Sequence, residues 1–168
     1  MYTTCNQSVY IFLFVWYNER MKVKYELRKS ENNDFKFVRD AKITTIFDYA
    51  KNISEEERKD ILSYVDRFTN KFLSEYKIIV KDNKNCGVFL VRDYEDGVLL
   101  DEIYLIPECR NLGIGSDVIK KELKKHGKVY LWVYKENARA VGLYKKLGFN
   151  VFEDKGERYL MVYNKCNN

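Results

Sequence analysis

The sequence has little of the chemistry that metal centres and covalent catalysts use. It holds one histidine in 168 residues, His126. We do not expect this side chain to be a catalytic base, because it lies at the far end of its predicted helix from the glycine-bearing loop described below. The four cysteines are scattered without a C-x-x-C pair: Cys5, Cys86, Cys109 and Cys166. This spacing indicates neither a zinc site nor a redox motif, so we expect no metal, and reduced thiols in a cytoplasmic protein.

Long apolar runs are also missing. The longest candidate, Val9–Tyr17, has only nine residues, which is too short to span a bilayer. No Lys or Arg precedes it and no small-residue cleavage site follows, so it does not fit a signal peptide. We therefore expect no membrane association. A natural first strand begins at Met21, and Met1–Arg20 is predicted to be an N-terminal extension, whether from a start codon placed too early, as an extra strand or as a dimer contact.

Charge of one sign does not dominate the chain. The 30 basic and 25 acidic residues leave a net charge of +5, which fits solubility and affinity for an anionic cofactor. No basic run interleaved with aromatic residues forms a recognisable nucleic-acid module, so no nucleic-acid partner is expected. The length suits one domain with a sizeable core, over residues 21–168.

Glycine is sparse, yet two of the eight glycines lie close together in Arg110-Asn111-Leu112-Gly113-Ile114-Gly115. This segment follows the predicted strand Val98–Ile106 and the only proline, Pro107, and it precedes a helix predicted from Ser116 to His126. A glycine turn before a helix N-terminus favours an anionic group such as pyrophosphate. A Rossmann fingerprint fails because Val118 stands at its third glycine, and a Walker loop fails because no Lys follows Gly115. A turn that uses glycine only for its geometry is the alternative.

A second pattern lies downstream of the glycine turn. Lys128–Tyr134 reads as a strand, and the following segment reads as a helix over Asn137–Leu147. Asn137 suits the N-cap, and Gly148 suits the position just beyond the helix end. One helical face carries four residues: Ala140, Leu143, Tyr144 and Leu147.

Taken together, Arg110-x-x-Gly-x-Gly and Asn137-x-x-Ala140-x-x-x-Tyr144-x-x-x-Gly148-Phe149 resemble the GNAT superfamily of acetyl-CoA-dependent N-acetyltransferases. The resemblance covers roughly residues 22–164. It implies an α/β fold with a mixed α+β sheet of about six to seven strands, flanked by about four helices. Two parallel strands, Val98–Ile106 and Lys128–Tyr134, are expected to splay into a V. The other predicted elements are strands at Lys22–Arg28, Tyr76–Lys81, Gly87–Tyr94, Phe149–Glu153 and Arg158–Tyr163, a helix at Asn33–Ala50, and a helix opened by the Ser54–Glu57 capping box.

The resemblance also implies acetyl-CoA as the cosubstrate. Its pantetheine arm is expected to lie in the V and to pair with backbone groups near Leu105 and Ile106, in the manner of an added strand. The residues expected to bind it are Leu105, Ile106, Arg110, Asn111, Leu112, Gly113, Ile114, Gly115, Ser116, Asn137, Ala140 and Tyr144.

The implied reaction is direct attack of a primary amine on the thioester in a ternary complex. Tyr144 is the candidate general acid for the leaving thiolate, and Glu102 is the candidate base. Asp101 is expected to face the other side of the strand. A salt bridge from Glu102 to a neighbouring Lys or Arg is an equally good explanation of its place among apolar residues. No covalent intermediate is needed, which agrees with the absence of a Ser-His-Asp set.

The acceptor is left open by the sequence. It is expected to be an amine-bearing small molecule or a protein or peptide, and a homodimer is not excluded. The alternative function is a non-catalytic acyl-CoA-binding regulatory module with the same fold.

Overall fold

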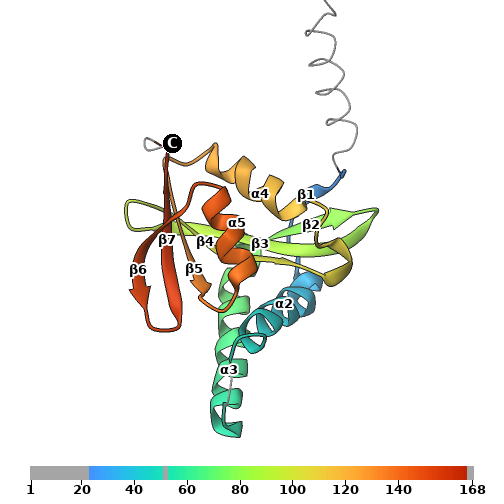
Figure 1. The fold of residues 1–168 in the computed structure, drawn as a ribbon. Coiled ribbons are helices and arrows are strands. Elements are labelled where there is room, and N and C mark those ends of the chain that lie inside the picture. The colour runs from blue at the N-terminus through green and yellow to red at the C-terminus, as the bar shows by residue number, and fades with distance from the viewer. Residues whose placement is uncertain (1–22, 51–52, 166–168) are drawn as a thin grey trace, which may run out of the picture.

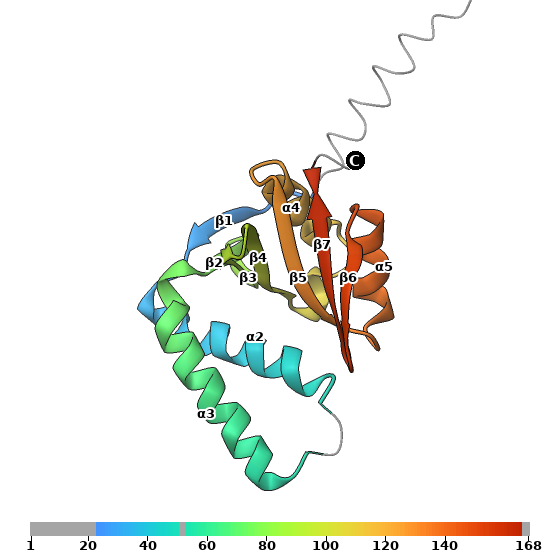
Figure 2. The same cartoon turned by 90° about the vertical axis from the view of Figure 1, so that its left-hand side faces the viewer.

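A computed structural model describes residues 23–50 and 53–165, which form a seven-stranded mixed sheet with helices on both faces (Figures 1 and 2). The predicted sheet of six to seven strands with four helices is confirmed. The strand order is β1-β2-β3-β4-β5-β7-β6. The strands are β1 (Glu26–Lys29), β2 (Lys77–Lys81), β3 (Lys84–Tyr94), β4 (Gly97–Leu105), β5 (Lys128–Tyr134), β6 (Asn150–Lys155) and β7 (Arg158–Asn164), and the helices are α2 (Phe35–Phe47), α3 (Glu55–Phe72), α4 (Ile114–Leu123) and α5 (Ala138–Lys146).

Alternation along the strands places apolar side chains on both faces of the sheet, where they form separate clusters. Ile78 of β2 packs with Val38 of α2 on one face, which α2 and α3 cover. Its neighbour Ile79 packs with Ile119 of α4 and Phe149 on the other face, which α4 and α5 cover. Because successive side chains of a strand point to opposite faces, the central strands are buried on both sides.

Local signals in the sequence fix the start of α3. Ser54 Oγ accepts a hydrogen bond from the backbone N–H of Glu57 at 3.2 Å, and Glu57 Oε2 accepts one from the backbone N–H of Ser54 at 2.7 Å. The predicted capping box is therefore confirmed. It satisfies two backbone donors that the first turn of a helix otherwise leaves unpaired.

The parallel strands β4 and β5 pair over only a short stretch. The register joins Val98 to Val129, Leu99 to Tyr130 and Leu100 to Leu131, and the pairing then ends. All other neighbouring strands are antiparallel. Beyond the third pair both strands continue without each other, so the predicted V is present.

The register between β3 and β4 contains a β-bulge. Leu90 pairs with Glu102, but the next residue, Val91, pairs with Leu100, so Asp101 is left without a partner position on β3. An extra residue in one strand breaks the regular alternation of side chains.

This bulge overturns the prediction that Asp101 and Glu102 face opposite sides of the strand. Asp101 Oδ2 accepts a hydrogen bond from Arg92 Nε at 2.6 Å, and Glu102 Oε2 accepts one from Lys42 Nζ at 2.9 Å. Both cations lie over the ring of Phe68 on α3, at 5.5 Å and 4.0 Å from its centroid. The two carboxylates therefore lie on the face that α2 and α3 cover.

The prediction of reduced thiols is also wrong for two cysteines. Cys86 and Cys109 form a disulfide across 23 positions of sequence. The antiparallel pairing of β3 with β4 brings the two cysteines together. Their spacing in the sequence does not predict this disulfide. The prediction of a cytoplasmic location was based on reduced thiols, and the disulfide removes that argument for it. Cys5, Cys166 and the expected extension Met1–Arg20 lie outside the described residues.

Two searches cover only the part of the chain that the structure describes. Within it, no helix is both long enough and apolar enough to cross a membrane. In the same residues, no three His, Cys, Asp or Glu side chains are grouped so that they could hold a metal ion.

Candidate functional site

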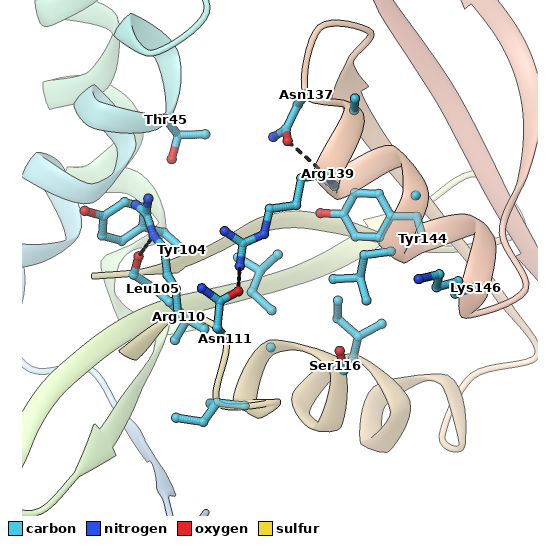
Figure 3. A pocket seen from close by; sticks show the side chains of 18 of the residues that line it. Thr45, Tyr104, Leu105, Arg110, Asn111, Ser116, Asn137, Arg139, Tyr144 and Lys146 are labelled. Atoms are coloured by element: carbon cyan, nitrogen blue, oxygen red, sulfur yellow. Dashed lines mark hydrogen bonds between the residues drawn. The ribbon is translucent and has the colours of Figure 1, made fainter. Parts of the chain in front are cut away.

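A hollow with a volume of about 750 Å³ lies beside the end of β4, beyond its pairing with β5. Five segments supply its walls: the end of α2, the end of β4, the glycine-bearing loop, α4 and α5 (Figure 3). The end of β4 contributes Ile103, Tyr104 and Leu105 to the lining, and the loop and the helices contribute the other sides.

The loop between β4 and α4 has an unusual backbone. Asn111 and Gly113 both adopt left-handed conformations, with φ of 62° and 79°. Gly113 is the N-cap of α4, so the helix begins at Ile114 rather than at the predicted Ser116. Glycine has no side chain to cap the helix, and Gly113, Ile114, Gly115 and Ser116 all line the cavity. The unpaired backbone donors of the first helical turn therefore lie at the cavity wall.

The two glycines of the loop serve different purposes. The left-handed φ of Gly113 strains any residue with a side chain, although a Cβ there would meet nothing within 4 Å. At Gly115 a Cβ would make ordinary contact with the side chain of Leu105 at 3.6 Å. Gly113 is thus required by the backbone of the turn, whereas Gly115 leaves space at the cavity wall.

Arg110 is held at the root of this loop. Its Nε donates to the backbone carbonyl of Leu105 at 2.8 Å, and its guanidinium lies 5.5 Å from the centroid of the Tyr104 ring (Figure 3). Both contacts direct the cation along the end of β4 and into the cavity lining. A positive charge at this position favours an anion at the helix N-terminus.

Helix α5 forms the opposite wall. Asn137 Oδ1 accepts a hydrogen bond from the backbone N–H of Ala140 at 3.0 Å, so the predicted N-cap is confirmed. Gly148 follows the helix with φ of 93°, as expected for a residue just past a helix end. The predicted helix Asn137–Leu147 is therefore correct to within one residue at each end.

Tyr144 projects from α5 with its hydroxyl directed into the cavity (Figure 3). Its ring packs edge-on against Phe149 at 5.8 Å between centroids. Burial raises the pKa of the Tyr144 phenol, and the charges of Glu102 and Tyr49 raise it further. In the described residues its hydroxyl has no hydrogen-bond partner. A tyrosine phenol is protonated at neutral pH at its ordinary pKa, and the raised pKa of Tyr144 extends that form to higher pH.

Glu102 does not belong to the cavity wall. It is 4% exposed and paired with Lys42, itself 7% exposed. The pair joins β4 to α2, and neither residue is in the cavity lining. A salt bridge was the alternative explanation for this residue, and the ion pair is present.

The structure brings ten of the twelve residues expected to bind the cofactor into one cavity lining. They are Leu105, Arg110, Asn111, Gly113, Ile114, Gly115, Ser116, Asn137, Ala140 and Tyr144. Two of the twelve are not in that lining. Ile106 turns its N–H to the carbonyl of Cys86 on β3 at 3.0 Å, and Leu112 is 39% exposed at the loop surface.

Several lining residues carry no signal in the sequence. Arg139, next to the N-cap of α5, reaches across the cavity and donates to Asn111 Oδ1 in the loop (Figure 3). Thr45, Asp48 and Tyr49 come from the end of α2, a helix without a recognised motif. The position of Arg139 between two motif residues, Asn137 and Ala140, could have drawn attention to it.

Comparison with known proteins decides the family. The family model "Acetyltransferase (GNAT) family" matches residues 26–149. The chain belongs to the GNAT family. The matched segment contains both sequence motifs and all the residues that line the cavity.

Individual relatives add detail to this GNAT assignment. An uncharacterised N-acetyltransferase of Methanocaldococcus jannaschii is 44% identical over 55 residues, which span 30% of this chain and only 24% of that protein. The PaiA N-acetyltransferase of Thermoplasma acidophilum, solved in complex with coenzyme A, is 19% identical with a TM-score of 0.68 over 84% of this chain and 99% of that one. The spermidine N-acetyltransferase of Vibrio cholerae, solved with coenzyme A and spermine, is 20% identical with a TM-score of 0.59 over 84% and 96%. These two structures agree with the fold.

Proposed function

We propose that this GNAT chain transfers the acetyl group of acetyl-CoA to a primary amine by direct attack in a ternary complex. One observation carries the proposal: the first turn of α4, Arg110 and the hydroxyl of Tyr144 line a single cavity. An anion site alone suits any phosphorylated ligand. A proton donor facing the same cavity suits a ligand whose leaving group must be protonated.

The residues of the loop fit the phosphate groups of coenzyme A. The α4 N-terminus offers backbone N–H groups, and Arg110 adds a positive charge beside them. Gly115 leaves the space that a closely approaching ligand needs. Lys146 is the only lysine in the described lining and is suited to a further phosphate. Among the groups that would contact the pantetheine arm are the end of β4 at Leu105 and the Asn137–Ala140 turn.

The protein's own residues would control the protons of the reaction. Acetyl-CoA supplies the acetyl group as a reactive thioester. Tyr144, whose phenol is protonated at neutral pH, would donate to the departing sulfur. Glu102 is outside the cavity lining, so it would receive the proton of the amine through a water rather than by direct contact. Its ion pair with Lys42 holds the carboxylate in place.

The acceptor would enter beside the end of α2. Tyr49 stacks on Tyr134 of β5 at 5.2 Å between ring centroids and 19° between ring planes. This stack connects α2 with β5 next to the cavity wall that holds Thr45 and Asp48. The acceptor site would therefore be narrowed by two aromatic rings, which favours an extended amine over a bulky one.

A coupled assay tests the proposal. Purified protein, acetyl-CoA and a panel of primary amines, including polyamines, amino acids and short peptides, are followed by release of free coenzyme A thiol. Amine-dependent release above the uncatalysed rate is expected for at least one acceptor class. Tight acetyl-CoA binding with no release on any amine would instead support the non-catalytic binding module.

A further inference from the structure

The disulfide between Cys86 and Cys109 lies directly beneath the proposed phosphate site. Cys86 is on β3, and Cys109 ends the short 3₁₀ turn Pro107–Cys109 that follows β4. The next residue in the chain is Arg110, the cation of the phosphate loop. The disulfide therefore links Cys109, which directly precedes the loop, to the central strand β3.

Hydrogen bonds also hold this turn, including those from the backbone N–H of Arg110 to the carbonyl of Pro107 at 3.1 Å and from Arg110 Nε to the carbonyl of Leu105 at 2.8 Å. The backbone N–H of Ile106 donates to the carbonyl of Cys86 at 3.0 Å, and the N–H of Cys109 donates to the carbonyl of Ile106 at 3.0 Å. Beyond this anchor the loop takes left-handed conformations at Asn111 and Gly113. Such conformations cost free energy unless the surrounding structure enforces them, so a fixed root favours the shape that receives the anion.

The two sulfur atoms differ in access to reagents. Cys86 is 1% exposed, whereas Cys109 is half-buried at the surface of the turn. A small thiol or disulfide would therefore react at Cys109, and Cys86 would act as the resolving partner.

We propose that Cys86 and Cys109 are a redox modification site whose disulfide form holds the phosphate loop ready for acetyl-CoA. This inference rests on the proposed function of the cavity. In oxidation, the Cys109 thiolate attacks a low-molecular-weight disulfide and releases one thiolate. The Cys86 thiolate then attacks the Cys109 sulfur of the mixed disulfide and releases the second. Two protein thiols and one small disulfide thus yield the protein disulfide and two small thiols. An excess of small thiol reverses the sequence.

The consequence is a difference in cofactor affinity between the two forms. The oxidised loop enters binding already ordered, whereas the reduced loop loses conformational freedom when the cofactor binds. Ordering costs of this kind reduce affinity without removing any contact. Acetyl-CoA should therefore bind about fivefold more tightly to the oxidised form.

The test uses the full chain with Cys5→Ser and Cys166→Ser, which leaves only the pair in question. One sample is equilibrated with oxidised glutathione and another with a phosphine reductant. Alkylation and intact mass then count free thiols, with none expected in the first sample and two in the second. Calorimetric titration with acetyl-CoA, which has no free thiol, gives Kd for each sample. Circular dichroism verifies that both are folded.

The outcomes separate this inference from the proposed function. A lower Kd in the oxidised sample, together with equal Kd values under both conditions for added Cys86→Ser or Cys109→Ala, supports the redox site. Measurable but equal Kd values for the two redox forms overturn it and leave cofactor binding intact. Failure of oxidised glutathione to form the bond overturns it as well. Absence of acetyl-CoA binding in both forms overturns the proposed function along with it.

Discussion

At the scale of single residues, Tyr144 is the side chain proposed to protonate the departing thiolate. A sequence motif identifies this residue, but the shift in its pKa follows from its surroundings in the fold. Burial and the nearby charge of Glu102 both raise the pKa of its phenol. A sequence motif cannot supply that information, because the contacting groups come from β4 and α2, more than 40 positions earlier in the chain.

Tyr144→Phe should lower kcat by at least about 100-fold, the contribution typical of a general acid. The phenylalanine keeps the ring packing against Phe149, so Kd for acetyl-CoA should change by less than about twofold, consistent with loss of a transition-state interaction alone. Steady-state kinetics and calorimetry measure the two quantities. Tyr163→Phe is the matched control, since Tyr163 also packs on Phe149 and is outside the described cavity lining. Equal losses in both variants would remove Tyr144 from the acid role.

The pH dependence of kcat should reflect the same raised pKa. An acid is active in its protonated form, and a raised pKa extends that form to higher pH. The rate should therefore show no loss from Tyr144 up to about pH 10, the ordinary pKa of a tyrosine. A decline in kcat centred well below that value, present in wild type and absent in Tyr144→Phe, would contradict the assignment.

At the scale of elements, one ion pair joins α2 to β4, and its carboxylate is also the proposed general base. Lys42 and Glu102 are both buried and 2.9 Å apart. The structural role and the proposed catalytic role of this carboxylate can be tested by separate measurements, one of stability and one of activity. The sequence could place Glu102 on its strand, but not its partner, because Lys42 lies 60 positions away.

Removing one partner of this pair should be costly, whereas replacing both should not. Lys42→Met alone should lower the free energy of unfolding by about 3 kcal/mol, because it leaves Glu102 buried and unpaired. The double variant Lys42→Met with Glu102→Leu should recover most of that loss. Urea denaturation measures both. Lys36→Met is the control on the same helix; its pair with Asp40 is exposed, and such pairs contribute roughly 0–1 kcal/mol.

The activity of the folded double variant then decides the catalytic role of Glu102. If Glu102 receives the amine proton, kcat should fall by about 100-fold or more even though the fold is retained. A double variant that transfers acetyl groups at the wild-type rate would mean that the ion pair serves only to join α2 to β4.

The elements themselves were predicted where local signals exist. The Ser54 cap, the turn at Gly148 and the strand Lys128–Tyr134 follow from the residues in and next to each element. The bulge at Asp101 does not, because it is a property of two paired strands. A prediction that assumes unbroken alternation along one strand therefore misplaces one of the two carboxylates.

At the scale of the whole molecule, the motif residues form about half of the cavity lining. The other lining residues come from elements that the fold brings beside them. Local spacing predicted the loop at Arg110–Gly115 and the wall at Asn137–Tyr144. Tyr49 and Thr45 line the cavity only because α2 crosses the open end of the V. No pattern in α2 predicts that position, so this side of the cavity could not be predicted from the sequence.

The disulfide is a second long-range feature with a measurable effect on the whole fold. It closes a segment that spans 23 positions, and cross-links of that size stabilise by about 2–4 kcal/mol. Urea denaturation of the oxidised chain should give a free energy of unfolding larger by that amount than the same chain under a phosphine reductant. Cys86→Ser should give one value under both conditions. A wild-type chain that is equally stable in both would show that the bond contributes nothing to the folded state.

The central claim is that the loop at Arg110–Gly115 is a binding site for acetyl-CoA, and calorimetric titration tests it most directly. Wild type should bind acetyl-CoA selectively over ATP and NAD. Gly113→Asp, which adds a side chain and a negative charge at a left-handed position of the site, should abolish detectable binding. Gly127→Asp, at another open glycine away from the described cavity lining, should bind like wild type. Wild-type affinity in Gly113→Asp, or no binding of acetyl-CoA by wild type, would contradict the account.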